Sequence, residues 1–238
     1  MKKILVLAMV LLTSIAFAGE FEIQPSMTQA QFDSLAKEMG AIVTPTPNSP
    51  AEPLKTLGFD IALETSVIDI DDDQAYWENA WDNGDPSGMA LVSRVHVQKG
   101  FPFGLDIGAS VSKGHTIPFT AVTGEVKYAL LKGTIATPAI SVKGSFTKVF
   151  GMEDISINTL SAGAYISKGI LFLTPYAGIE TVYTMATDDS GNDFDKVNTN
   201  AARGLVGLQI SPLPLISINL EVAKGAVMQY GLKAGIRF

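Results

Sequence analysis

From residue 57 to its last residue, the chain consists of segments in which apolar and polar side chains alternate. The C-terminal stretch QYGLKAGIRF is the clearest example, because every second residue back from Phe238 belongs to one mostly apolar face. Side chains of a β-strand point alternately to its two faces, so the pattern predicts strands with one apolar side. Ten such segments follow one another, at 57–70, 89–99, 103–112, 118–130, 137–149, 155–167, 171–185, 201–211, 214–223 and 226–238.

The first eighteen residues have a different character. Lys2 and Lys3 precede a short apolar run, and Ala16-Phe17-Ala18 supplies the small residues that a signal peptidase recognises. No cysteine follows, so a lipid-anchored lipoprotein is not expected. We interpret residues 1–18 as a secretory signal peptide.

Composition narrows the functional classes. The absence of cysteine excludes disulfides, thiolate metal sites and thiol catalysis. A net charge of -7 disfavours nucleic acid as a partner, because no basic patch is present to meet phosphates. Apolar residues make up 47% of the chain, yet no run of them after the signal is long enough for a membrane-spanning helix. This apolar surface must therefore lie inside a soluble β-sandwich or face lipid around a barrel.

The lengths of the connections favour the barrel. Every second connection along the chain forms one set: 71–88, 113–117, 150–154, 186–200 and 224–225. This set includes both long connections. The connections between them, such as GFPF and PL, are all short. Outer-membrane barrels have long loops outside and short turns on the periplasmic side. We therefore expect an all-β, transmembrane, up-and-down antiparallel barrel of about ten strands over residues 57–238, in a bacterial outer membrane. The soluble sandwich is the alternative.

Residues 19–56 do not follow the strand pattern. Ser26 or Thr28 is a candidate N-cap, Phe32, Leu35, Ala36 and Met39 have helical spacing, and Gly40 is a stop signal. TPTPNSPAEP then places four prolines in ten residues, as in a stiff extended linker. We expect a periplasmic amphipathic helix and linker, with the helix serving as a plug or docking element or simply resting against the barrel rim.

Charged residues gather on the strand faces opposite the apolar ones. In a barrel these faces point into the lumen, where opposite charges would pair and fill a narrow interior. A gated path or a substrate site among the charges is the alternative. One segment is irregular, because 155–167 has Leu160, Ala162, Ala164 and Ile166 on the face expected to be polar. The predicted lumenal charges are Asp60, Glu64, Arg94, His96, Asp106, Glu125, Lys127, Lys143, Glu180, Arg203, Glu221, Lys233 and Arg237.

Signals for catalysis are weak. A membrane-embedded esterase would need a serine, a histidine and a carboxylate close together, and Ser112, His115 and Asp106 are the only arrangement that the spacing suggests. Asp106 lies well down its strand, so a turn histidine without a catalytic role is the better interpretation. We expect no enzymatic activity, no cofactor and no resident metal centre.

Two predicted outer connections are acidic. The stretch 71–88 holds six acidic residues and no basic one, and 187–198 adds four carboxylates against one lysine. Asp69, Asp71 and Asp73 have the spacing of a calcium loop, although Gln74 and Ala80 occupy positions where that loop needs glycine and glutamate. The candidates for binding a divalent cation beside lipopolysaccharide, or a partner, are Asp71, Asp73, Trp77, Trp81, Asp189 and Asp193. Alternatively the rim is merely solvated, with both tryptophans in the interfacial belt.

The last strand carries a second kind of signal. Tyr230, Leu232, Ile236 and Phe238 form an apolar face that ends on the terminal residue. We interpret it as the signal for the barrel-insertion machinery. The other expected partners are outer-membrane lipid and lipopolysaccharide.

Three stretches resemble an uncharacterised family of bacterial outer-membrane β-barrel proteins: SRVHVQKGFPFGLDIGASVSKG, GEVKYALLKGTIATPAISVKGSFTKV and YISKGILFLTPYAGIE. The resemblance extends over most of residues 54–238 and implies the barrel, but no activity. The sequence thus predicts an outer-membrane protein of structural or surface-binding type with a charge-paired lumen. A narrow channel for a small solute is the alternative.

Overall fold

A computed structural model describes residues 20–82 and 88–238. The expected signal peptide, residues 1–18, lies outside this part. Within it, none of the helices has the length and apolar character needed to span a membrane.

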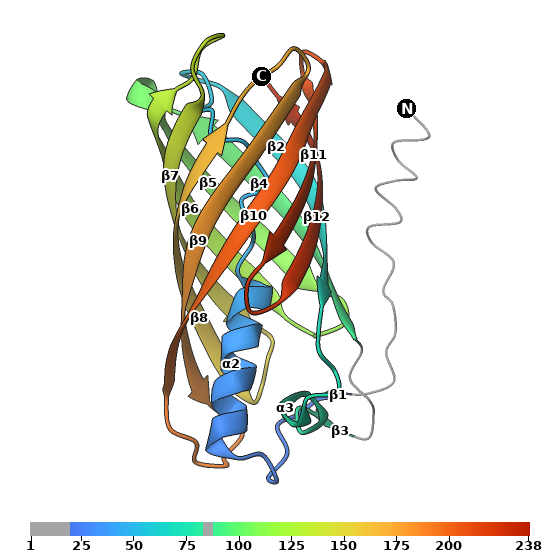
Figure 1. Cartoon of the computed structure of the whole chain (residues 1–238). Coiled ribbons are helices and arrows are strands. Elements are labelled where there is room, and N and C mark those ends of the chain that lie inside the picture. The colour runs from blue at the N-terminus through green and yellow to red at the C-terminus, as the bar shows by residue number, and fades with distance from the viewer. Residues whose placement is uncertain (1–19, 83–87) are drawn as a thin grey trace.

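Ten strands close into one antiparallel barrel, which confirms the predicted fold class (Figure 1). Every strand pairs with the next along the chain, and the last pairs with the first, so the barrel has no free sheet edge. The strands are β2 (Phe59–Asp69), β4 (Met89–Gly100), β5 (Leu105–Gly114), β6 (Thr120–Lys132), β7 (Ala139–Phe150), β8 (Ile155–Ser167), β9 (Leu173–Asp188), β10 (Val197–Leu213), β11 (Ile216–Lys224) and β12 (Met228–Arg237).

The two ends of the barrel differ. We call "loop end" the end with connections 70–88, 115–119, 151–154, 189–196 and 225–227, and "turn end" the end with 101–104, 133–138, 168–172 and 214–215. The loop end also holds the short elements β1 (Glu20–Phe21), α3 (Ala75–Glu78) and β3 (Trp81–Asp82). The turn end holds the 3-10 turn η1 (Pro102–Gly104) and the C-terminus.

The apolar face of each strand points outward. Ile61, Leu63, Ile107, Val126 and Leu220 are among the large apolar side chains exposed on the outside. The irregular segment 155–167 obeys the same rule, since Leu160 and Ile166 are exposed and the alternate residues are buried. The expected polar face of that strand was therefore wrong by one residue.

The N-terminal helix α2 (Gln29–Val43) begins where the sequence predicted, with Thr28 as N-cap in a capping box with Gln31. It does not stop at Gly40 as expected. Gly40 faces Thr184 on the wall so closely that a Cβ would collide with that side chain. This glycine therefore permits close helix–wall contact instead of ending the helix.

Helix α2 lies at the loop end, inside the mouth of the barrel (Figure 1). The sequence predicts the helix and the long connections at opposite ends of the barrel. This part of the prediction is wrong. Ile23 N–H donates to Asp154 at 2.7 Å, and the Phe32 ring stacks on Phe194 with centroids 4.9 Å apart. Both partners belong to loop-end connections.

The wall around α2 is apolar. In this "loop half" of the lumen, helix residues pack against inward-facing strand residues in one hydrophobic core. The irregularity of β8 has its cause here, since Ile155 and Ile157 point inward to meet the helix. The core includes Phe32, Leu35, Met39, Ile42, Val43, Ile68, Val92, Phe119, Ala121, Val149, Ile155, Ile157, Ala186, Val197 and Val227.

The proline-rich segment 44–56 continues from α2 through the rest of the lumen, the "turn half", and emerges where β2 begins (Figure 1). Residues 46–51 are all buried. The expectation of a periplasmic linker outside the barrel was therefore wrong. We refer to residues 44–56 as the internal segment.

Candidate functional site in the barrel lumen

The charged wall of the turn half surrounds the internal segment. Of the thirteen charges expected to face the lumen, the structure buries all but Arg237, whose side chain is 27% exposed near the turn end. Burial of this many ionised groups is costly unless each has a partner. The positions of those partners therefore determine what the lumen can do.

Most of the charges form one connected group. Lys233 Nζ lies 3.0 Å from Asp60 and 3.9 Å from Glu64, and Arg94 also pairs with Glu64. His96 lies between two carboxylates, with Nδ1 3.2 Å from Glu64 and Nε2 3.2 Å from Glu125.

Four further pairs complete the wall's ion pairing. Lys143 lies 2.7 Å from Glu125, and Arg237 lies 2.8 Å from Asp60, so both extend the connected group. Lys127 pairs with Asp106 at 3.2 Å. Arg203 pairs with Glu180 at 2.8 Å.

Glu221 differs from the other five lumenal carboxylates. None of the described lysine, arginine or histidine side chains forms an ion pair with it, although it is buried. Its Oε2 instead accepts a hydrogen bond from the backbone N–H of Asn48, at 3.0 Å. The partner of this carboxylate is therefore the internal segment itself.

The wall cations bind carbonyl groups of the internal segment. Arg203 donates to Thr44 O at 3.0 Å and to Pro45 O at 2.8 Å, and Arg94 donates to Thr46 O at 3.1 Å. Lys127 donates to Glu52 O at 3.0 Å. A proline-rich chain has few N–H groups and makes no regular backbone ladder, so its carbonyls need donors from elsewhere.

Two further N–H groups of the internal segment meet wall acceptors. Leu54 N–H donates to both carboxylate oxygens of Asp106, at 3.1 Å each, and Ala51 N–H donates to Ser167 Oγ at 3.1 Å. Wall cations therefore bind carbonyls of the segment at several points, and wall carboxylates or a serine hydroxyl accept from three of its N–H groups. The turn half of the lumen is a binding groove whose ligand is the chain's own backbone.

Trp77 and Trp81 do not lie on the outer surface. Trp77 is fully buried and its Nε1–H donates to Glu38 of α2 at 2.8 Å, while Trp81 packs edge-on against Phe21 at 6.1 Å between centroids. The proposal of an exposed aromatic binding surface or an interfacial anchor was therefore wrong for both. Trp77 ties connection 70–88 to helix α2, and Trp81 ties it to β1.

Tyr76 forms the same tie, because its hydroxyl donates to Glu38 at 2.8 Å. Burial and this bond to a carboxylate raise the pKa of the Tyr76 phenol. The connection and the helix thus form one cap over the loop end.

The acidic candidates of the loops are exposed and dispersed. Asp71 and Asp73 lie in connection 70–88, and Asp189 and Asp193 lie in connection 189–196. Among the residues that the structure describes, no three acidic or histidine side chains come close enough to hold a metal ion. A divalent-cation site at these residues stays a prediction without a preformed cluster to support it.

The three residues considered for catalysis are separated. His115 Nε2 lies 2.9 Å from Ser93 Oγ. Ser112 is buried on the lumenal face of β5, opposite Arg94 of β4. Asp106 is at the turn end with Lys127. Partial burial, and then the charge of Lys113, lower the pKa of His115. This imidazole therefore has neither the serine nor the carboxylate that the arrangement needed.

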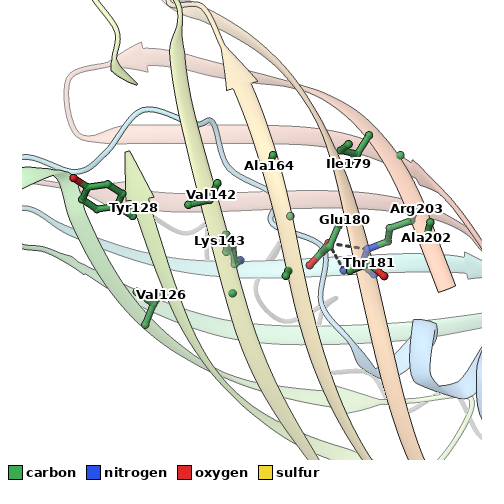
Figure 2. Close-up of a pocket in the computed structure, with 14 residues that line it drawn as sticks. Val126, Tyr128, Val142, Lys143, Ala164, Ile179, Glu180, Thr181, Ala202 and Arg203 are labelled. Atoms are coloured by element: carbon green, nitrogen blue, oxygen red, sulfur yellow. Dashed lines mark hydrogen bonds and ion pairs between the residues drawn. The ribbon is translucent and has the colours of Figure 1, made fainter. Parts of the chain in front are cut away.

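A shallow hollow of about 970 Å³ lies on the barrel wall across β6 to β10 (Figure 2). Small residues such as Gly144, Ala162, Ala164 and Gly204 form it, with the Glu180–Arg203 pair directly behind. The hollow opens on the outer face of the barrel. It reveals how thin the wall is where glycine and alanine replace larger side chains.

The C-terminal residues Tyr230, Leu232, Ile236 and Phe238 all point outward on or just after β12. Phe238 stacks on Phe59 of β2, with centroids 5.6 Å apart, and its backbone pairs with Phe59. These contacts close the barrel. Whether the same face serves as an insertion signal stays a prediction.

Sequence reasoning missed the internal segment as a functional element. One signal available was the number of charges on the inner faces, because six cations and six acids in a narrow lumen need more hydrogen-bond partners than their own ion pairs supply. The four prolines between the helix and the first strand were the other signal, since they remove donors from a segment that then needs cationic partners.

Comparison with known proteins adds architecture only. No protein family matches the chain, and no curated protein is similar to it in sequence. Among solved structures, KdgM porin is 11% identical over 75% of this chain and 99% of that one, with a TM-score of 0.41. Ail of Yersinia pestis is 11% identical over 77% and 100%, with a TM-score of 0.35.

The translocator domain of the autotransporter NalP from Neisseria meningitidis is 9% identical over 88% of this chain and 97% of that one, with a TM-score of 0.41. At these values the similarity does not bear on function. No match therefore identifies the family that the sequence resembles.

Proposed function

We propose that the chain is an outer-membrane barrel closed by its own N-terminal segment, with a structural or surface-binding role. The apolar outer face, the closed edges and strands of spanning length support the membrane location. A soluble protein rarely exposes so large a continuous apolar belt.

The loop end is proposed to face outward. Its two longest connections, 70–88 and 189–196, are longer than any turn at the other end, as in outer-membrane barrels, and the C-terminus lies at the turn end. Helix α2 and the cap are then at the cell surface, and the internal segment runs from the surface toward the periplasm. This orientation replaces the periplasmic helix expected from the sequence.

One observation supports a closed barrel. Charged wall side chains bind the backbone of the internal segment by hydrogen bonds, and they are Arg203, Arg94, Lys127, Glu221 and Asp106. These contacts, together with the core around α2, fill the lumen. The gap between the two halves measures about 20 Å³, which is room for about one water molecule and too little for a solute.

Thiol labelling tests closure and orientation together, since the natural chain has no cysteine to interfere. Lys37→Cys, exposed on α2, should react with an impermeant maleimide on intact cells. Pro47→Cys, buried in the internal segment, should react only after denaturation, and Ala136→Cys at the turn end only after the outer membrane is opened.

Labelling of Ala136→Cys but not Lys37→Cys on intact cells would reverse the orientation. Ready labelling of Pro47→Cys in the folded protein would contradict the closed lumen. Slower gel migration after heating serves as the check that each variant forms a barrel.

A second candidate function is a narrow channel whose internal segment moves aside. It is favoured by the polar character of the turn half, because the wall keeps charged groups facing any path that opens. Planar-bilayer recording of the mature protein distinguishes the two. A silent barrel supports the closed protein, whereas steady, reproducible openings would put the channel first.

A further inference from the structure

The turn end carries a hollow that the lumen does not explain. It has a volume of about 760 Å³ and lies where the internal segment leaves the barrel, between the turns 101–104, 133–138 and 168–172. Lys55 and Lys132 line it, together with Leu54, Ile135 and Leu171. We propose that this hollow binds an anionic phospholipid of the periplasmic leaflet, with the two lysines at its phosphate.

The two lysines are available for a ligand. In the described part of the chain, neither the Lys55 nor the Lys132 side chain forms an ion pair or a hydrogen bond, and both residues are exposed. Glu52 is the acid that lines the hollow, and its Oε1 already accepts from Gly169 N–H at 3.1 Å. Two lysines against this one carboxylate leave the site with a net positive charge.

Other cations at this end are already engaged. Lys168 Nζ donates to Ile135 O at 2.6 Å and to Thr134 O at 3.0 Å, which fixes the turn 133–138. Lys99 Nζ lies 4.4 Å from the centroid of the Phe59 ring. These two lysines build the rim and add to its positive potential without occupying the hollow.

The rim is apolar as well as basic. Phe103, Ile135 and Leu171 are 84%, 101% and 98% exposed at the tips of three turns. Phe103 and Leu171 also have positive φ angles, 66° and 54°, which bulky residues rarely adopt. Strained turns that hold large apolar side chains away from the protein are expected where those side chains contact another apolar surface.

Charge separates this end from the other. The loop-end connections carry Asp71, Asp72, Asp73, Asp189 and Asp193 among their acids, whereas the turn end carries the four lysines described above against Glu52. A basic and apolar rim at the level of the headgroups suits a lipid with an anionic head and acyl chains. An anionic or polar ligand without acyl chains would leave the apolar tips in water.

The inference rests on the proposed membrane location, and the experiment separates the two. Delipidated mature protein in detergent is incubated with phosphatidylglycerol or phosphatidylcholine, and bound lipid is counted by native mass spectrometry. Phosphatidylglycerol should be retained at least tenfold better. Lys55→Gln/Lys132→Gln should lower that retention on the order of 20-fold, from about fivefold for each lysine near an anionic headgroup.

Matched controls come from the loop end. Lys113→Gln/Lys148→Gln removes two exposed lysines there and should change retention less than twofold. Lys55→Arg/Lys132→Arg keeps the charge and should keep most of the binding. Ile135→Gln/Leu171→Gln should weaken long-chain phosphatidylglycerol but not the dihexanoyl form.

Equal retention of the two lipids, or unchanged retention in Lys55→Gln/Lys132→Gln, would overturn the lipid site. An equal loss in the loop-end control would do the same, because it would show a nonspecific charge effect. Insertion of the wild-type barrel into phosphatidylcholine vesicles is measured in parallel. If insertion succeeds and selective binding fails, only this inference is lost; if insertion fails, the membrane location itself is contradicted.

Discussion

The two halves of the lumen are filled in opposite ways. In the loop half, the side chains of α2 pack against apolar wall residues, as in the core of a soluble protein. In the turn half, charged wall residues such as Arg203 and Asp106 bind backbone groups of the internal segment. Side-chain packing fixes the first half and backbone hydrogen bonding fixes the second.

The difference determines in which half a substitution should affect stability more. Apolar packing weakens gradually when atoms are removed, whereas a buried ion pair that loses one member leaves an uncompensated charge. The turn half is therefore the half in which a single substitution should have the largest effect. Four variants examine this contrast, in order of decreasing expected effect.

Removing one member of a buried pair should be the most damaging change. Glu180→Leu leaves Arg203 without its carboxylate, so the free energy of unfolding should fall by about 3–5 kcal/mol. Reversible urea unfolding in lipid vesicles measures it. Ile179→Ala, on the outward face of the same strand, is the control and should have a much smaller effect. Equal losses for the two would mean that the lumenal pair is unimportant.

Truncating the apolar core should cost somewhat less. Leu35→Ala in α2 removes a fully buried side chain and should lower the free energy of unfolding by about 2–5 kcal/mol. Lys37→Ala, on the exposed side of the helix, is the matched control. Hydrogen exchange should accelerate in α2 while the internal segment stays protected. Simultaneous loss of protection in both would indicate that the two halves act as one unit.

Overfilling the helix–wall contact should have an intermediate effect. Gly40→Ala places a methyl group against Thr184, which should cost about 1–3 kcal/mol. Thr184→Ala in the same chain makes room and should recover part of that loss. If the double variant is as unstable as the sum of the two single ones, the contact is not the cause.

The smallest effect is expected at the cap. Tyr76→Phe removes the hydrogen bond to Glu38 and should lower the free energy of unfolding by about 0.5–1.5 kcal/mol, with faster proteolysis of connection 70–88. The raised pKa of Tyr76 adds a pH dependence. Stability from this tie is complete below the ordinary tyrosine pKa of about 10 and is lost as the pH rises toward the raised value. Tyr76→Phe should abolish that alkaline loss.

Much of the barrel could be predicted because strand periodicity is local. The exposed Ile61 and Leu63 and the buried Asp60 and Glu64 follow from alternation along a single strand. Strand β8 was misread because alternation alone does not say which face is inside. Ile155 and Ile157 point inward only because a helix distant in sequence lies there.

The location of the N-terminal segment could not be read in the same way. Thr28 and Gln31 define the start of α2 locally, but nothing local states that Phe32 and Leu35 face a barrel wall. The sequence predicts Trp77 on the outer surface because no residue near it in the chain indicates its partner. That partner, Glu38, belongs to helix α2.

The sequence by itself determined the number of strands, the faces of all of them except β8, and the identity of the inward charges, because each depends on residues adjacent along one strand. Tertiary structure alone decided that the lumen is filled, from which end the helix enters, and that the wall charges bind the chain's own backbone. Those outcomes depend on contacts between segments far apart in sequence, such as Asn48 with Glu221. Periodicity reports which way a side chain points, and only the closed barrel brings its partner to it.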